Sequence, residues 1–276
     1  GTAREYYRLY SETARLIKEK HPEVLVGGYS SCYILGANVN GKWTEGPTDY
    51  FTGFLAYITA PETAAPLDFF SWHGYLGRDR LEKIGREFSF IKKTLSEYGL
   101  ENVPVFDTEW NCNIATGEVD KDRTMYYINM RNEYGASHAA AALCEMQRLG
   151  VDAAMYYDAQ LWCAYGALFN VPELTPTKTY HAFKAFSKLY ELADACEIQN
   201  DTTVYTCAAT DGKACRAIIS NLKDSDFEIE LQIDGFDCTS ILLTSADGAE
   251  LPVSRENGKF ILPANSFVFV EAKARG

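Results

Sequence analysis

The sequence lacks long apolar runs and clusters of basic residues, and each absence excludes a class of function. No stretch approaches the roughly 20 consecutive apolar residues of a membrane-spanning helix, so we expect no membrane partner. The net charge is −12, whereas nucleic-acid-binding proteins usually carry a basic patch, so we expect no nucleic-acid partner. An acidic chain with 18 Tyr, 15 Phe and 4 Trp suits a neutral ligand that stacks on aromatic faces.

Paired cysteine motifs and nucleotide-binding glycine loops are also absent from the sequence. The eight cysteines are scattered without a CxxC pair, which is typical of reduced, buried thiols and favours a bacterial-type cytoplasmic protein. An alternative stays open, because Cys207 and Cys215 flank an Asp211-Gly212 turn across which they could pair. No cluster of metal ligands appears, and "VGGYS" lacks the spacing of nucleotide loops, so we expect no metal and no other cofactor.

The first two thirds of the chain alternate between helical and strand patterns. Apolar residues recur at helical spacing in several long segments, and a short apolar run follows most of them. The expected helices are 3–20, 47–59, 78–98, 122–149 and 177–192, and the expected strands lie in 23–28, 67–75, 103–111 and 151–158. The expected inner face of the first helix carries Tyr6, Leu9, Tyr10, Thr13, Leu16 and Ile17, and that of the third carries Leu81, Ile84, Phe88, Ile91 and Leu95. Strands that alternate with helices of this length predict βαβ units and a four-stranded parallel sheet.

The pattern changes after about residue 194. Apolar and polar residues alternate with period two around Asp-Gly and Asn-Gly dipeptides, which predicts an antiparallel β domain of six to eight strands. We therefore expect an α/β region over residues 1–193 and a β domain over 194–276. No long linker separates the two regions, so we expect them to pack against each other.

Polar and aromatic residues gather at the carboxyl end of each expected parallel strand. They are Tyr29 to Ser31, then His73 and Tyr75, then Glu109 to Asn111, and finally Tyr156 to Asp158. Ligand chemistry in parallel α/β sheets and barrels is located at this end of the strands. Four strands do not close a barrel.

Several segments occur in an order and spacing that resemble clan A glycoside hydrolases. These are "REYYRLYSETARLIKEKHPEVLVGG", "LDFFSWHGY", "FDTEWN" and "LFN…TPTKTYHAFKAF", and together they span roughly residues 4–190. The resemblance is closest to family 39, the β-xylosidase and α-L-iduronidase type. It implies an α/β fold consisting of strands five to eight, the C-terminal half, of a (β/α)8 TIM barrel followed by an antiparallel β-sandwich. It also implies hydrolysis of O-glycosyl bonds with retention of configuration.

The resemblance implies that Glu109, in "TEWN", is the catalytic nucleophile. A retaining glycosidase needs two carboxyl groups about 5–5.5 Å apart, one to attack and one to protonate the leaving oxygen. The family uses the residues matching His73 and Tyr75 against the sugar and the nucleophile, and strand alternation directs both to one face. From the residues alone, Glu109 could instead cap a loop, and His73 could be a core histidine.

Four further residues are candidates for binding an oligosaccharide or glycoside substrate. Trp110 and Asn111 follow Glu109 directly, although they could instead close the strand end and cap the loop. Asp158 and Trp162 follow the last strand, in a segment where the family often carries acidic sugar-binding residues. Trp162 is either an aromatic platform for a sugar or a plug against the β domain. This departure from the family pattern leaves the identity of the sugar open.

The second carboxyl group that the resemblance requires is missing from the sequence. The family's general acid is the Glu of an Asn-Glu pair after strand four, and the only Asn-Glu here, Asn132-Glu133, lies within an expected helix. We expect the acid upstream of residue 1, in an N-terminal half of the same barrel. The chain alone would then be inactive, with exposed sheet edges that a homo-oligomer would cover. The alternative function is that of a non-catalytic carbohydrate-binding module.

Overall fold

The computed structural model describes residues 2–32, 34–39, 42–45, 49–112, 127–163, 165–200, 202–244 and 249–276. Contacts divide the chain into two compact units. The first unit comprises Gly1–Tyr75, Glu82–Trp110 and Leu149–Tyr156, and the second comprises Leu76–Leu81, Asn111–Arg148 and Tyr157–Gly276. Parts of two expected helices, residues 47–48 and 122–126, lie outside the described residues.

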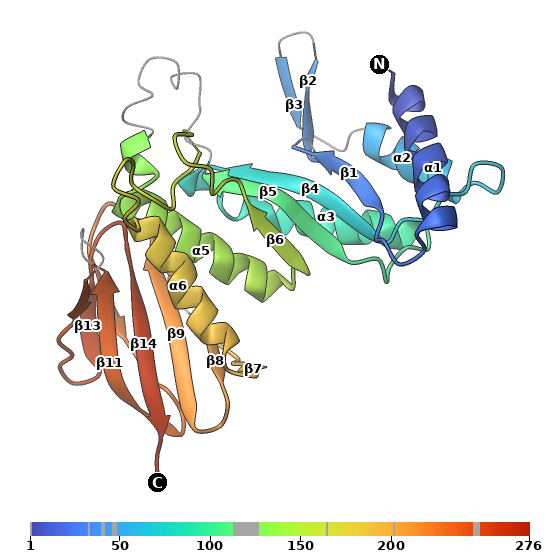
Figure 1. Ribbon diagram of the computed structural model, residues 1–276. Coiled ribbons are helices and arrows are strands. Elements are labelled where there is room, and N and C mark those ends of the chain that lie inside the picture. The colour runs from blue at the N-terminus through green and yellow to red at the C-terminus, as the bar shows by residue number, and fades with distance from the viewer. Residues whose placement is uncertain are drawn as a thin grey trace. The chain divides into compact units, whose positions relative to one another are not determined.

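The first unit contains a four-stranded parallel sheet, as the alternating pattern predicted. Its strand order is β1-β4-β5-β6 (Figure 1). The strands are β1 (Gly27–Ser31), β4 (Phe69–Leu76), β5 (Val105–Cys112) and β6 (Ala153–Tyr156). The helices are α1 (Ala3–Lys20), α2 (Asp49–Thr59) and α3 (Lys83–Glu97). A hairpin of β2 (Gly36–Val39) and β3 (Lys42–Glu45) was not predicted, because a pair of four-residue strands carries little periodic signal.

Aromatic and aliphatic side chains from α1, α2, α3 and β4 share one core in the first unit. The predicted inner face of the 78–98 segment is confirmed, because Leu81, Ile84, Phe88, Ile91 and Leu95 are all buried. The expected helix 78–98 is interrupted, since a 3-10 turn over Arg78–Arg80 precedes α3.

The predicted inner face of α1 is partly wrong. Tyr10 is buried, but Leu9 and Leu16 are 64% and 51% exposed. Tyr7 and Ala14 are buried in their place, so the buried stripe is rotated towards these residues. The helix begins with a capping box, in which the Thr2 side chain accepts a hydrogen bond from the backbone N–H of Glu5.

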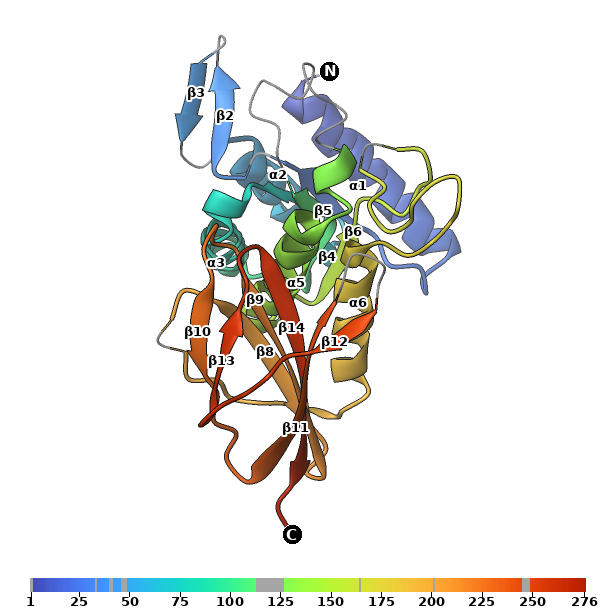
Figure 2. The same ribbon diagram turned by 90° about the vertical axis from the view of Figure 1, so that its left-hand side faces the viewer.

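The second unit contains the antiparallel strands that the period-two pattern predicted. A six-stranded sheet has the order β12-β11-β14-β9-β8-β7, and β10 pairs with β13 beside it (Figure 2). The strands are β7 (Asp194–Ala195), β8 (Tyr205–Thr210), β9 (Ala214–Asn221), β10 (Phe227–Glu230), β11 (Phe236–Thr244), β12 (Glu250–Pro252), β13 (Lys259–Leu262) and β14 (Ser266–Ala274). Buried side chains from both sheets form one core.

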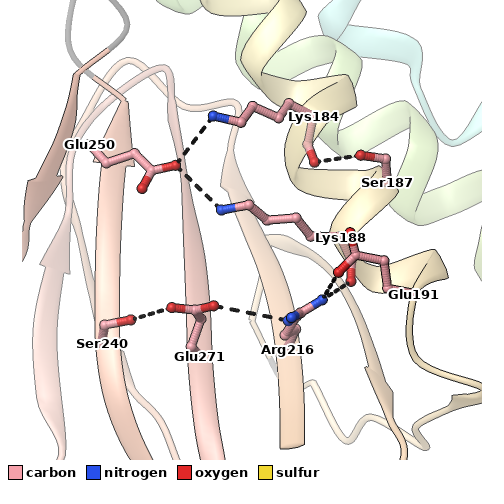
Figure 3. Close-up of polar contacts among 8 residues, drawn as sticks. All are labelled: Lys184, Ser187, Lys188, Glu191, Arg216, Ser240, Glu250 and Glu271. Atoms are coloured by element: carbon pink, nitrogen blue, oxygen red, sulfur yellow. Dashed lines mark hydrogen bonds and ion pairs between the residues drawn. The ribbon is translucent and has the colours of Figure 1, made fainter.

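Helices α5 (Glu133–Leu149) and α6 (Lys178–Tyr190) belong to the same unit as these sheets. The Ser220 hydroxyl on β9 donates to the Ser137 carbonyl on α5 at 2.8 Å. Arg216, also on β9, donates to the Lys188 carbonyl at 2.6 Å (Figure 3). Within this unit, the part of residues 1–193 that forms α5 and α6 therefore packs against the β domain, as expected. The boundary between residues 193 and 194 stays a prediction.

None of the helices in the described part of the chain is long and apolar enough to cross a membrane.

Candidate active site

Strands β4 and β5 are neighbours in the parallel sheet, and their carboxyl-terminal ends bring three candidate residues together. The Tyr75 hydroxyl donates a hydrogen bond to Oε2 of Glu109 at 2.7 Å. Nδ1 of His73 lies 3.4 Å from the same oxygen. We expected these three side chains on one concave surface with Tyr75 in hydrogen-bond reach of Glu109; the hydrogen bond is confirmed and the concavity stays a prediction. Their catalytic and binding roles stay predictions.

The protonation state of His73 follows from its surroundings. Burial lowers its pKa below the ordinary range, and the Glu109 carboxylate opposes this shift only in part. The imidazole is therefore mainly neutral near pH 7. A carboxylate oxygen accepts hydrogen bonds but cannot donate them, so the contact with Glu109 favours the tautomer that carries its proton on Nδ1. Tyr75 is then the hydrogen-bond donor to Glu109, and the neutral His73 ring lies beside the same oxygen. About a third of the Glu109 side-chain surface is exposed.

A register shift in β5 separates the environments of Asp107 and Glu109. Strict alternation would place both carboxylates on one face of the sheet. The pairing with β6 is irregular between Asp107 and Trp110, so alternation is not maintained there. Asp107 is fully buried and accepts a hydrogen bond from the Gly74 N–H at 3.0 Å. Glu109, two residues later, is left partly open to solvent.

Asp107 and Glu87 form a pair of buried carboxyl groups beneath this surface. Burial raises the pKa of Asp107 well above its usual range, and nearby Glu87 adds to the shift. Burial also raises the pKa of Glu87, although Lys83 at 3.3 Å opposes it. Sequence reasoning missed this pair. The signal was available for Asp107, because the residue ends the apolar run "VPVFD".

Asp107 fixes the strand that carries His73 and Tyr75. Its hydrogen bond goes to Gly74, the residue between them, and its Oδ2 atom has no hydrogen-bond partner in the described part of the structure. A Cβ atom added at Gly74 would lie 2.3 Å from that Oδ2. Only glycine fits here without displacing the carboxyl group.

A thiol that was not predicted also borders these residues. Cys32 is exposed, and its Sγ lies 3.6 Å from Nδ1 of His73. Burial of the thiol group raises the pKa of Cys32, and the Glu109 carboxylate adds to this effect. Cys32 therefore carries a protonated thiol near pH 7. Among the residues that the structure describes, no group of three or more His, Cys, Asp and Glu side chains is placed to hold a metal ion.

The other predicted binding residues have surroundings of different kinds. Trp110 is 2% exposed and packs edge-on against Tyr156. These contacts agree with a role in closing the end of the strand, which was the alternative to sugar binding. Asn111 belongs to the second unit, where it is buried and its side-chain amide donates to the Tyr157 carbonyl at 2.5 Å. Both residues have packing or loop-fixing contacts, and a role of either in binding stays a prediction.

Asp158 and Trp162 also belong to the second unit. Oδ1 of Asp158 accepts a hydrogen bond from the Gln160 N–H at 3.1 Å, which fixes the turn after β6. Trp162 is 72% exposed, so its indole is open to solvent rather than packed as a plug in this unit.

Comparisons with known proteins find likeness in structure alone. No family model matches the sequence, and no curated protein is similar to it. A glucosidase from Croceicoccus marinus is 19% identical over 100% of this chain and 66% of its own, with a TM-score of 0.63. A monomeric β-xylosidase from Caulobacter crescentus is 15% identical over 98% and 66%, with a TM-score of 0.66. A GH39 enzyme from Xanthomonas axonopodis pv. citri is 14% identical over 99% and 65%, with a TM-score of 0.65.

The chain therefore has the fold of part of several glycosidases. The resemblance to family 39 that the sequence motifs suggested is confirmed at the level of fold. The chain spans slightly less than two thirds of the length of each of these solved structures.

Proposed function

We propose that this chain is part of a retaining glycoside hydrolase in which Glu109 is the nucleophile. The observation that carries the proposal is the placement of Tyr75 and His73, 2.7 and 3.4 Å from one oxygen of Glu109 at the ends of parallel strands. The Tyr75 hydrogen bond and the neighbouring His73 ring both engage Oε2, which leaves the other oxygen of Glu109 to attack. The glycosidase fold of the solved structures supports the same assignment.

The proposed reaction proceeds in two balanced steps. In the first, a Glu109 oxygen bonds to the anomeric carbon as the glycosidic bond breaks, and a general acid protonates the departing oxygen. In the second, that acid, now a base, takes a proton from water, and the water oxygen replaces Glu109 on the anomeric carbon. His73 donates to a sugar hydroxyl or to Glu109, and Tyr75 keeps the carboxylate aligned.

We place the general acid outside this chain, in the rest of a longer protein. Asp107 and Glu87 both interact with this surface, and they are too deeply buried to reach a leaving oxygen. In this proposal β1, β4, β5 and β6 are strands five to eight of a (β/α)8 barrel, and the antiparallel sheets form a β-sandwich. The greater length of the similar solved structures supports the proposal.

Covalent trapping tests the nucleophile. The complete protein is incubated with a 2-fluoro β-xyloside that carries a good leaving group, and it is then digested for mass spectrometry. The β-xylosidase among the similar structures makes xylose the first sugar to try. We expect the label on the peptide that contains Glu109, and none in a Glu109→Gln variant. A label on another carboxylate would overturn the assignment.

Assaying the chain by itself tests the location of the acid. General acid catalysis contributes about 10²–10⁴-fold, so this chain alone should hydrolyse aryl β-xylosides far more slowly than the complete protein. Equal activity from a chain of confirmed mass would show that the acid lies within these 276 residues.

A carbohydrate-binding module is the second candidate, and the exposure of Trp162 favours it. Solvent-exposed indoles offer an apolar face with a polar edge, on which sugar rings can stack. Calorimetric titration of the complete protein with xylo-oligosaccharides separates the two functions. Binding that Trp162→Ala abolishes, without hydrolysis in the parent protein, would favour the module.

A further inference from the structure

A cavity of about 550 Å³ in the second unit is bordered by three cysteines. Cys144 lies on α5, Cys207 lies on β8, and Cys196 follows β7. Arg148 and Glu145, which form an ion pair at 2.7 Å, also line this cavity. Cys144 lies more than 50 residues before the other two, and no sequence motif connects the three.

Cys144 and Cys207 have sulfur atoms 3.0 Å apart. Both residues are buried, with exposures of 1% and 4%. A disulfide bond joins sulfurs at about 2.05 Å, so a relative shift of about 1 Å would close the bond. The two positions are 63 residues apart, and the bond would tie helix α5 to strand β8.

Two more cysteines of this unit form a second pair. The thiols of Cys196 and Cys215 are hydrogen-bonded to each other. Burial, and to a smaller extent this contact with Cys196, raises the pKa of Cys215 to about 12. Cys207 and Cys215, which flank the Asp211-Gly212 turn, therefore have different partners. The four thiols do not make a metal centre, because no described set of three or more ligands is suitably placed.

We propose that Cys144 and Cys207 are a site of oxidative modification that closes to a disulfide bond. The co-reactant is a small disulfide of the glutathione class. The thiolate of one cysteine attacks it, which gives a mixed disulfide and releases one glutathione thiolate. The second cysteine then attacks the mixed disulfide and releases the other. The two thiol protons go to the two released thiolates, and the two electrons reduce the small disulfide.

The bond closes during folding rather than in the finished fold. Burial, together with the neighbouring Cys207 thiol, holds the pKa of Cys144 well above its ordinary range. The attacking species is the thiolate, so exchange at a buried, protonated thiol is slow. An unfolded or partly folded chain exposes both thiols to the oxidant. The modification therefore reports whether the chain folded in an oxidising or a reducing environment.

Refolding in a defined redox buffer tests the site. The chain is refolded with oxidised and reduced glutathione, blocked with N-ethylmaleimide, digested and analysed by mass spectrometry. We expect a Cys144–Cys207 crosslinked peptide, and a Tm roughly 5–15 °C above that of the dithiothreitol-reduced chain. Oxidant added to the already folded, reduced chain should give the same peptide much more slowly.

Serine variants provide the controls. Cys144→Ser and Cys207→Ser should each lose the crosslink and the gain in Tm, whereas Cys163→Ser, at a free cysteine outside both pairs, should keep them. The parent chain decides the question even if a variant fails to fold. Separate alkylation of Cys144 and Cys207 after oxidative refolding would overturn the proposal, as would a crosslink between Cys207 and Cys215.

Discussion

Acidic side chains have different surroundings in the two units. On the six-stranded sheet of the second unit, Glu250 lies 3.4 Å from Lys188, and Arg216 contacts both Glu191 and Glu271 (Figure 3). In the first unit, by contrast, Glu109 accepts a hydrogen bond from the neutral Tyr75 hydroxyl, and the buried Asp107 carboxyl group is bonded by backbone N–H groups, with no cation from the described residues on either carboxyl group.

The difference teaches where to look for chemistry. A carboxylate balanced by a flexible cation at the surface contributes little beyond local stability. A carboxylate held by fixed, uncharged donors keeps a charge that a reacting carbon can use, and buried acids behind it restrict where the strand can move. The Glu109 and Asp107 carboxyl groups of the first unit are held by fixed, uncharged donors. They should therefore respond to substitution quite differently from the cation-paired carboxylates of the second unit.

Neutralising one carboxylate in each unit should produce the largest contrast. In the complete protein, Glu109→Gln removes the attacking oxygen and should lower kcat about 10³-fold or more. Glu250→Gln removes a charge from the paired network and should leave kcat unchanged. Steady-state kinetics on an aryl β-xyloside measure both. If both variants lose activity, or if both keep it, the proposed difference between the carboxylates of the two units is wrong.

Low pH should destabilise the second unit because His138 is protonated more readily in the unfolded chain than in the folded one. Its Nε2 lies 3.1 Å from the Leu76 carbonyl, and burial, with nearby Arg78, lowers its pKa to about 3. The unfolded chain takes up this proton near pH 6.5, before the folded state does, so stability falls as pH drops from about 6.5 towards 3. The full loss is on the order of 5 kcal/mol.

A glutamine at this position isolates the effect. His138→Gln keeps a donor for the carbonyl but cannot titrate, so urea unfolding at pH 7 and pH 5 should give more similar stabilities than in the parent chain. His21→Asn, at an exposed position on the first unit, is the control and should leave the pH dependence intact. An unchanged slope in His138→Gln would refute the assignment.

Adding one methyl group at Gly74 should affect the first unit. The new Cβ would meet Oδ2 of Asp107 at 2.3 Å, so Gly74→Ala should cost roughly 1–3 kcal/mol of unfolding free energy. Part of this cost should vanish in the double variant Gly74→Ala with Asp107→Ala, where the clash is gone. Denaturant unfolding of the four chains gives the coupling. If the unfolding free-energy changes of the two single variants simply add in the double variant, the Asp107 carboxyl group moves aside without strain.

The fold was largely readable from the sequence because its periodicities are strong. Strand-length apolar runs between long helices indicated the parallel sheet, and period-two alternation with Asp-Gly turns indicated the antiparallel strands. The inner face of α1 was harder to predict, because Leu9 and Leu16 match helical spacing as well as Tyr7 and Ala14 do. The packing of α1 against α2 and the sheet decides that Tyr7 and Ala14 are buried, and this packing cannot be inferred from the spacing.

The candidate site was readable where it follows strand ends, and unreadable where it depends on register. His73, Tyr75 and Glu109 were brought together by alternation on neighbouring strands. The burial of Asp107 was not predicted, because a one-residue irregularity in β5 changes the alternation. The approach of Cys32 to His73 depends on how β1 pairs with β4, where the register also shifts. The apolar run before Asp107 hinted at its burial, but local sequence carries no signal for the register shifts themselves.

The smallest effect should come from the paired network on the second unit. Glu250 lies 3.4 Å from Lys188 and 3.9 Å from Lys184, and all three side chains are more than a quarter exposed. Exposed pairs contribute about 0.2–1 kcal/mol, because water screens the charges and ordering long side chains costs entropy. Glu250→Gln should lower stability by no more than this at low salt, and by nothing measurable near 1 M NaCl, where the screening length is about 3 Å. Glu173→Gln, at an exposed carboxylate without an ion partner among the described residues, is the matched control and should change little at either salt concentration. A loss above about 2 kcal/mol that persists in high salt would mean that this network, like the surface around Glu109, depends on fixed geometry rather than on screened charge.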